Sequence, residues 1–145
     1  MSWYQAVAFT RWLSEKTGEK IQLPTEQQWE KAARGTDGRV YPWGDDFNNT
    51  CANSEDSGLE ETNPVGMYDR VESPYGVSEM AGNVLEWCED WFNADRDSRV
   101  LRGGSWDFTS YFVRSAIRYN HFPADRGNLI GFRIVCVPIH WKLIH

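Results

Sequence analysis

The chain begins with a segment whose apolar residues recur at the spacing of an amphipathic helix. Ser2 precedes this segment as a helix-capping residue, and Gly18 follows it as a helix-ending residue. The expected apolar face contains Trp3, Ala6, Val7, Phe9 and Leu13.

A second helix is expected directly after Pro24. Thr25 and Gln28 have the spacing of a capping box, in which each side chain bonds the backbone of the other residue. Gly35 ends the segment. The predicted buried stripe consists of Trp29, Ala32 and Ala33.

Between residues 36 and 78 neither a helical nor a strand period persists. Glycine, proline, asparagine, aspartate and serine recur every few residues, which is typical of turns. Aromatic residues run through the same stretch, so its composition is not that of a disordered linker. We therefore expect an ordered, irregular segment held by specific hydrogen bonds.

Strand-like patterns follow in the second half of the chain. They cover residues 84–91, 99–106, 112–119 and 130–137, and Pro138 ends the last of them. Two helices followed by loops and short antiparallel strands predict an α+β domain and not a doubly wound sheet. In the last range the alternating apolar positions are Ile130, Phe132, Ile134 and Cys136.

Composition limits the function. The 145 residues fit one domain, and the net charge of −6 argues against nucleic-acid binding, which needs a basic surface. No apolar run has the length of a membrane span, and the first residues lack a signal-peptide pattern, so we expect a cytoplasmic protein, with surface display left open. The three cysteines, Cys51, Cys88 and Cys136, are odd in number and widely spaced, which favours buried thiols over disulfides.

Eight phrases of sequence occur in an order that resembles a known family, the formylglycine-generating-enzyme (sulfatase-modifying factor) domains. The resemblance covers residues 1–137, leaves 138–145 as a tail, and lacks the family's N-terminal strands. It implies a C-type-lectin-like α+β fold with two N-terminal helices, long irregular loops and short antiparallel strands. The phrases are Trp3 to Phe9, Leu23 to Glu30, Tyr41 to Asp45, Asn63 to Gly66, Met80 to Trp87, Arg102 to Trp106, Arg114 to Arg118 and Gly131 to Val135.

The resemblance also bears on catalysis. In the true enzymes of this family, two cysteines shortly after the Gly-Gly-Ser phrase bind copper and activate oxygen. The matching positions here are Phe108 and Val113, whose side chains cannot bind a metal. The related sulfoxide synthases hold iron through histidines of a separate helical domain, and this sequence has only His121, His140 and His145. We therefore expect that the protein binds neither copper nor iron and has no enzyme activity. The alternative is that the protein is an accessory or degenerate member of the enzyme family.

Residues 107–129 resemble the variable region of ligand-binding proteins that are diversified by retroelements. Mutagenesis of the adenines in AAC codons leaves codons ending in C, which cannot encode Lys, Glu, Gln, Met or Trp, and none of these five occurs between Asp107 and Leu129. The implied partner is an unidentified protein or other macromolecule, and a plain interaction module without diversification is the remaining alternative. The candidate contact residues are Asp107, Phe108, Thr109, Tyr111, Phe112, Ile117, Tyr119, Asn120, His121, Phe122, Asp125, Asn128 and Leu129.

Residues interleaved with these candidates are interpreted as the frame of the fold. Gly103 and Gly104 permit left-handed backbone or a close approach of two chain segments. We expect the forked donors of the arginines to bond the carbonyls of irregular loops. The arginines in question are Arg114, Arg118, Arg126 and Arg133.

The family resemblance further implies structural calcium in the irregular segment. Asn83 and Glu86 match one site, and Asn53, with an acid such as Glu61, matches a second. Oxygen ligands of this kind suit calcium. The alternative is that these side chains satisfy buried backbone groups without a metal.

Overall fold

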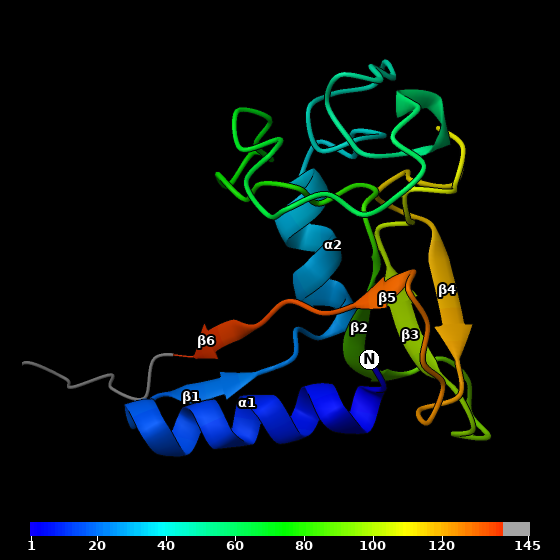
Figure 1. Cartoon of the computed structure of the whole chain (residues 1–145). Coiled ribbons are helices and arrows are strands. Elements are labelled where there is room, and N and C mark those ends of the chain that lie inside the picture. Colours follow the sequence, from blue (N-terminus) through cyan, green and yellow to red (C-terminus); the bar gives the residue numbers. More distant parts are fainter. Residues whose placement is uncertain (138–145) are drawn as a thin grey trace, which may run out of the picture.

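The computed structural model describes residues 1–137, so the expectations for the tail at 138–145 lie outside the described residues. Figure 1 shows two helices, α1 (Trp3–Thr17) and α2 (Glu26–Arg34), beside small sheets, with long loops gathered at one end of the molecule. The α+β expectation is therefore confirmed. No helix among the described residues is both long enough and apolar enough to cross a lipid bilayer.

Both helices begin and end at the predicted residues. The Ser2 hydroxyl accepts a hydrogen bond from the Gln5 backbone N–H at 3.3 Å, and Gly18 closes α1 with a φ of +74°. The Thr25 hydroxyl accepts from the Gln28 N–H at 3.1 Å in the same way. These caps bond N–H groups that have no partner inside the first turn of a helix.

The central sheet has four strands in the order β4-β3-β2-β5. β3 pairs antiparallel with both β2 and β4, whereas β5 runs parallel to β2, so the expectation of purely antiparallel strands is wrong at β5. β1 (Lys20–Gln22) and β6 (Val135–Val137) form a separate antiparallel pair. The bounds of the central strands are β2 Leu85–Trp91, β3 Arg99–Arg102, β4 Arg118–His121 and β5 Ile130–Gly131.

The strand expected at 112–119 is wrong over most of its length. The Phe112 N–H donates to the Thr109 carbonyl at 2.9 Å, and the Ile117 N–H donates to the Arg114 carbonyl at 3.1 Å. These are successive turns, and extended backbone begins only at Arg118. β3 likewise ends before the predicted residue 106, because left-handed glycines follow Arg102.

The strand expected at 130–137 is interrupted. Its first part, β5, pairs with β2, and its second part, β6, pairs with β1, so the two parts belong to different sheets. Ile134 and Cys136 are exposed, so the predicted alternation does not describe a single buried face. The physical reason is that the chain changes partner strand at residues 132–134.

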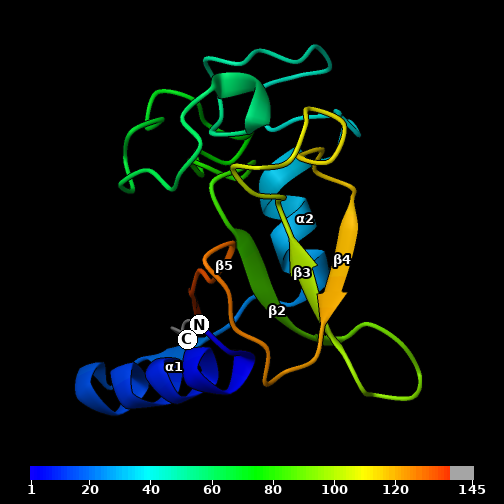
Figure 2. The ribbon, with the colours of Figure 1, turned by 45° about the vertical axis from the view of Figure 1, so that its right-hand side comes forward.

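The two faces of the central sheet carry different cores. Trp87 and Leu101 lie opposite each other in register and pack with Ala6 of α1. On the other face, Cys88 and Val100 pack with Trp29 of α2. Figure 2 shows α2 lying along the sheet, with β4 at the sheet edge.

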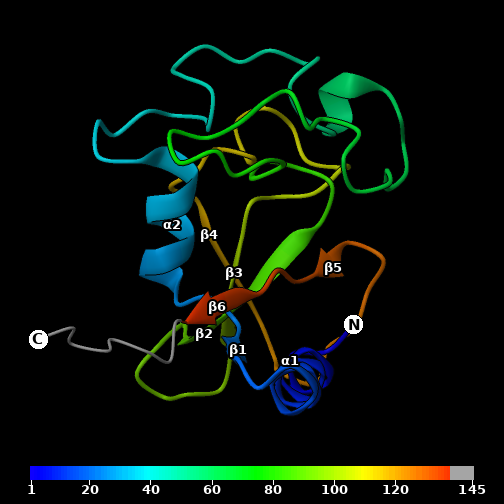
Figure 3. The same ribbon diagram turned by 90° about the vertical axis from the view of Figure 1, so that its left-hand side faces the viewer.

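The irregular segment has a small core of its own. Tyr41 and Ala52 pack with Ala81 and Val113. The Asn83 N–H donates to the Asn53 carbonyl at 2.8 Å, which joins two distant loops, and a short 3-10 helix, η1 (Glu55–Ser57), follows Asn53. Figure 3 shows these loops stacked at one end of the molecule. The expectation of an ordered segment held by specific bonds is confirmed.

The cysteines correct the expectation of buried thiols. All three are free, but only Cys88 is buried, whereas Cys51 is half-buried and Cys136 is exposed. Burial raises the pKa of the Cys88 thiol well above its usual range. Cys136 belongs to the short β6, which pairs only with β1, and this leaves one side of the strand in solvent.

Candidate ligand-binding surface

Residues 107–129 form the turns before β4, β4 itself and the loop that returns to β5 (Figure 1). Every candidate contact residue in this segment is exposed or half-buried. Between them, Val113, Ser115 and Pro123 are buried, as is Ile130 directly after the segment. A few buried residues therefore alternate with exposed and half-buried ones, although Ala116, Arg118 and Arg126, which were expected in the frame, are exposed.

Four rings gather where the turns meet β4, and we call Phe108, Tyr111, Phe112 and Tyr119 the aromatic patch. The ring centroids of Phe108 and Tyr119 are 5.3 Å apart, and those of Tyr111 and Phe112 are 5.1 Å apart. Tyr111 is 56% exposed and Phe112 is 46% exposed. Phe108 instead packs against both the α1-side core and the loop core, so it supports the patch more than it faces a partner.

Hydrogen bonds fix the backbone beneath the aromatic patch. The Tyr119 hydroxyl donates to the Phe112 carbonyl at 2.6 Å, and the Tyr41 hydroxyl donates to the Ser110 carbonyl at 3.1 Å. The Ser110 N–H in turn donates to the Asp56 carboxylate at 2.7 Å. Burial raises the pKa of Tyr119 to about 12, so its hydroxyl stays protonated as a donor at neutral pH. A surface held in this way loses little conformational entropy when a partner binds.

A second group of candidates lies at the other end of β4. His121 Nδ1 is 3.0 Å from an Asp125 carboxylate oxygen, which also accepts the Phe122 N–H at 3.1 Å. These residues and Asn120 line a pocket of about 320 Å³ with Phe92 and Asp97. None of the four rings of the aromatic patch lines this pocket.

The remaining candidates lie outside both groups. The Asp107 carboxylate accepts a hydrogen bond from the Ser105 hydroxyl at 2.8 Å, so it stabilises the turn after Gly104. Asn128 is exposed, and Leu129 is half-buried next to β5, where its carbonyl accepts the Leu85 N–H at 2.7 Å. Thr109 lies in the turns, and Ile117 faces a separate pocket beside α2. The candidate set therefore does not form one continuous patch.

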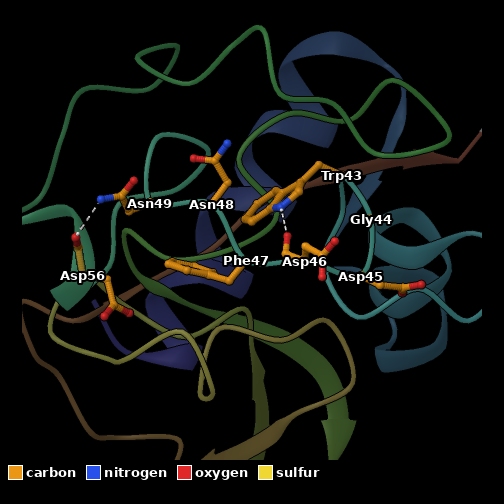
Figure 4. A pocket seen from close by; sticks show the side chains of 8 residues that line it. All are labelled: Trp43, Gly44, Asp45, Asp46, Phe47, Asn48, Asn49 and Asp56. Carbon is orange, nitrogen blue, oxygen red and sulfur yellow. Dashed lines mark hydrogen bonds between the residues drawn. The ribbon is translucent and has the colours of Figure 1, made fainter.

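Sequence reasoning missed an acidic, aromatic pocket formed by residues of the irregular segment (Figure 4). Its volume is about 700 Å³. Asp56 belongs to its wall and also binds the Ser110 N–H, which ties the pocket to residues 107–129. The signal in the sequence was the run of aromatic and acidic residues after Pro42. The lining residues are Trp43, Gly44, Asp45, Asp46, Phe47, Asn48, Asn49 and Asp56.

The two positions that match the family's copper cysteines lie in unlike surroundings. Val113 is fully buried, and a Cβ atom built on Gly104 would lie only 2.8 Å from its Cγ1 atom. Phe108 is half-buried between two cores. Neither side chain contains an atom that can bind a metal or form a nucleophile.

Arginines connect this segment to the rest of the fold. Arg114 Nε donates to the Tyr111 carbonyl and Arg133 donates to the Glu79 carbonyl, as expected of loop-bonding arginines. Arg118 instead pairs with the Glu26 carboxylate at 2.5 and 2.8 Å, so that expectation is wrong there. No hydrogen bond from the exposed Arg126 side chain is present within residues 1–137.

A further arginine that contacts this segment, Arg102, was not identified from the sequence. Arg102 is 1% exposed and binds Glu26, Glu30 and the Ser115 carbonyl, each at 2.7 Å. Burial alone would raise the pKa of Glu30, but hydrogen bonds from Arg102 and Arg34 hold it below its usual value. The available signal was the pair of glutamates four residues apart on α2, which share one helix face.

The candidate calcium ligands are already bonded to protein groups. The Glu86 carboxylate accepts from Arg133 at 2.5 and 2.8 Å and from the Trp29 indole N–H at 2.6 Å. Asn83 Oδ1 accepts the Asn63 N–H at 3.0 Å. Asn53 Oδ1 accepts from a serine hydroxyl, and its amide donates to the Glu61 carbonyl at 2.8 Å. These side chains do not fit a calcium site in this arrangement, and calcium stays a prediction from the resemblance.

The fold and the loops around Gly104 define a C-type-lectin-like domain of the formylglycine-generating-enzyme type. Residues 1–137 match the family described as the sulfatase-modifying factor enzyme 1-like domain, so the chain belongs to that family.

Several relatives show how varied this family is. The chain is 33% identical over 92% of its length to inactive C-alpha-formylglycine-generating enzyme 2 from Bos taurus. It is 36% identical over 96% of its length to formylglycine-generating enzyme from Thermomonospora curvata, and 34% identical over 92% to serine/threonine-protein kinase pkn1 from Chlamydia caviae. It spans 48%, 55% and 23% of those three proteins, which is about half of their length or less.

One similar solved structure bears directly on the surface described above. Treponema denticola variable protein 1 superposes with a TM-score of 0.87 at 26% identity, covering 95% of this chain and 70% of that one. The family thus includes proteins named as enzymes, as inactive enzymes and, by structure, as a variable protein.

Proposed function

We propose that this protein is a non-catalytic ligand-binding module that presents the solvent-facing side chains of residues 107–129 to a macromolecular partner. The observation that carries the proposal is the aromatic patch, in which the exposed rings of Tyr111 and Phe112 lie beside Phe108 and Tyr119. Tyrosine and phenylalanine supply large contact areas at small entropic cost, and exposed aromatic groups that cluster mark partner sites.

Two further observations support the proposal. The family resemblance aligns Phe108 and Val113 with the copper cysteines of the true enzymes, and neither side chain can supply a metal-binding thiolate. The likeness to Treponema denticola variable protein 1 favours diversification of this segment by a retroelement. A near-copy of codons 107–129 beside the gene, differing at adenines, is the expected genomic signature, and its absence together with the absence of a reverse transcriptase would leave a plain binding module.

A second candidate function is that of a degenerate or accessory member of the enzyme family. The 33% identity to an inactive formylglycine-generating enzyme from Bos taurus favours it. The two candidates differ in where a partner binds, because only the first requires the aromatic patch.

The binding test uses a random-peptide library displayed on phage and selected on the immobilised protein. Tyr111→Ala is compared with Tyr75→Ala, a matched control in which a tyrosine of nearly equal exposure, 55% against 56%, is removed outside the segment. We expect selected peptides to bind the Tyr111→Ala variant about tenfold more weakly and the control variant unchanged. Equal binding to both variants would contradict the proposal.

The absence of catalysis is tested separately. We expect the purified protein, supplied with copper(I) and a cysteine-containing peptide, to consume no oxygen above the peptide and copper alone. Oxygen uptake that depends on the protein would overturn the non-catalytic assignment.

A further inference from the structure

Arg114 lies in the middle of the proposed surface and is held rigidly. Its guanidinium carbon lies 3.6 Å from the centroid of the Tyr111 ring, and its Nε donates to the Tyr111 carbonyl at 2.8 Å. Stacking and hydrogen bonding together fix both the plane and the direction of the guanidinium. A donor group fixed before binding loses less entropy when it meets an acceptor.

The charge of Arg114 has no carboxylate partner within residues 1–137. The buried Arg102 and the half-buried Arg133 each bind glutamate, whereas no carboxylate oxygen of the described chain lies within 4.0 Å of Arg114. Its two terminal nitrogens make no hydrogen bond in the same part of the chain. The guanidinium of Arg114 therefore has a fixed position, two terminal nitrogens available as donors and a charge that no carboxylate of the described residues balances.

Arg114 borders a small apolar pocket. Val40, Ala116 and Ile117 form its apolar wall, Arg114 and Arg34 complete it, and its volume is about 320 Å³. Both terminal nitrogens of Arg34 are engaged, one with Glu30 and one with the Gly38 carbonyl, whereas those of Arg114 make no hydrogen bond within residues 1–137. The space suits one side chain with an apolar stem.

The electrostatics of the neighbouring helix favour an anion here. Along α2, the guanidinium groups of Arg34, Arg102 and Arg118 share only two carboxylates, those of Glu26 and Glu30. The Glu30 carboxylate that pairs with Arg34 is shared with Arg102, so the charge of Arg34 beside the pocket is only partly balanced, although the whole chain carries a net charge of −6.

We propose that the pocket between Arg114 and Ile117 binds a carboxylate-bearing side chain of an acidic peptide segment, with Arg114 determining specificity. Guanidinium binds carboxylate through two parallel hydrogen bonds, which fixes the orientation of the bound group as well as its charge. The apolar wall contacts the stem of the same side chain. This inference rests on the proposed function and names the chemistry of the partner. It also changes the interpretation of Arg114 from a loop-bonding residue to a contact residue.

A direct test uses two small probes of similar shape, 4-phenylbutyrate and the neutral 4-phenylbutan-1-ol. Methyl NMR shifts of Ala116 and Ile117 report on the pocket. We expect saturable shifts with the carboxylate probe and binding about tenfold weaker with the alcohol. Equal binding of both probes, or shifts that spare these two methyl groups, would overturn the proposal.

Variants separate the role of charge from that of folding. Arg114→Gln is expected to weaken 4-phenylbutyrate binding about tenfold. Arg114→Lys keeps the charge but loses the two parallel donors of the guanidinium, so its affinity is expected to lie between those of the parent protein and Arg114→Gln. Arg126→Gln removes an exposed arginine of the same segment outside the pocket and is expected to bind like the parent. Circular dichroism spectra that match the parent show that each variant is folded. Unchanged binding by Arg114→Gln would overturn the inference.

The same variants distinguish this inference from the proposed function. Phage-selected peptides that depend on Tyr111 and on Arg114, and that are enriched in Asp and Glu, support both. Peptides that depend on Tyr111 but bind Arg114→Gln equally well overturn the carboxylate pocket and leave the binding function standing. Peptides that depend on neither residue overturn both.

Discussion

Val113 packs directly onto Gly104, so closely that a Cβ atom on the glycine would lie 2.8 Å from Val113 Cγ1 and 3.0 Å from the Phe112 carbonyl oxygen. Gly104 also has a left-handed backbone, with a φ of +75°. This contact brings the end of β3 against the turns that support the aromatic patch. Val113, which the family resemblance aligns with a catalytic cysteine, is thus part of the support for this surface.

The Gly104 contact predicts the effect of adding one methyl group. Gly104→Ala combines left-handed strain with a clash, so we expect a loss of about 3 kcal/mol of unfolding free energy, measured by urea denaturation. Gly18→Ala is the matched control, since Gly18 has a φ of +74° and no atom within 4 Å of the added Cβ. We expect that variant to lose roughly 1 kcal/mol. Equal losses would show that the close approach adds no cost.

The ion pair between Arg133 and Glu86 predicts a strong stability effect. Arg133→Met leaves the nearly buried Glu86 carboxylate with only the Trp29 N–H, and we expect a loss of about 3 kcal/mol in thermal or urea unfolding. The double variant with Glu86→Gln removes the uncompensated charge while keeping an acceptor for Trp29. It is expected to be more stable than the single variant, and the reverse order would contradict this account.

The Tyr119 hydroxyl predicts a pH effect. Burial raises its pKa from the usual 10.0 to about 12, so the folded state holds this proton more tightly than the unfolded state. The corresponding stability is complete below pH 10 and is lost as the pH rises toward 12. Ultraviolet titration of tyrosinate should show a late transition that is absent in Tyr119→Phe. We expect that variant to lose about 1 kcal/mol at neutral pH, because the bond to the Phe112 carbonyl is removed.

The hydrogen bonds of Glu86, Asn83 and Asn53 predict the outcome of metal removal. Because the side-chain oxygens of all three already accept protein donors, we expect the same melting temperature in excess EDTA as in excess calcium. Differential scanning calorimetry of dialysed protein measures this. A melting temperature that rises with calcium concentration would show that the folded protein binds calcium, as the family resemblance implies.

Local signals in the sequence were sufficient for the helices. The capping pairs Ser2–Gln5 and Thr25–Gln28 act within a single turn, so the residues that decide where each helix begins are neighbours in sequence. The strands depended on partners far along the chain. The alternation at 130–137 is continuous in sequence, yet the chain leaves β2 for β1 midway, and no local pattern records such a change.

The sequence by itself determined where the two helices begin and end, because the capping residues are neighbours in sequence. It did not fully determine which residues of 107–129 face solvent, since Arg118 and Arg126, expected in the frame, are exposed. Only the tertiary structure decided how those residues are grouped. Tyr111 and Tyr119 both contact Phe112, because successive turns bring the segment back on itself, while His121 lies at the far end of β4. It also decided that Arg114 meets no carboxylate within residues 1–137, since a charge is neutralised by its neighbours in space, and those of Arg114 include Arg34 of α2 and Val40.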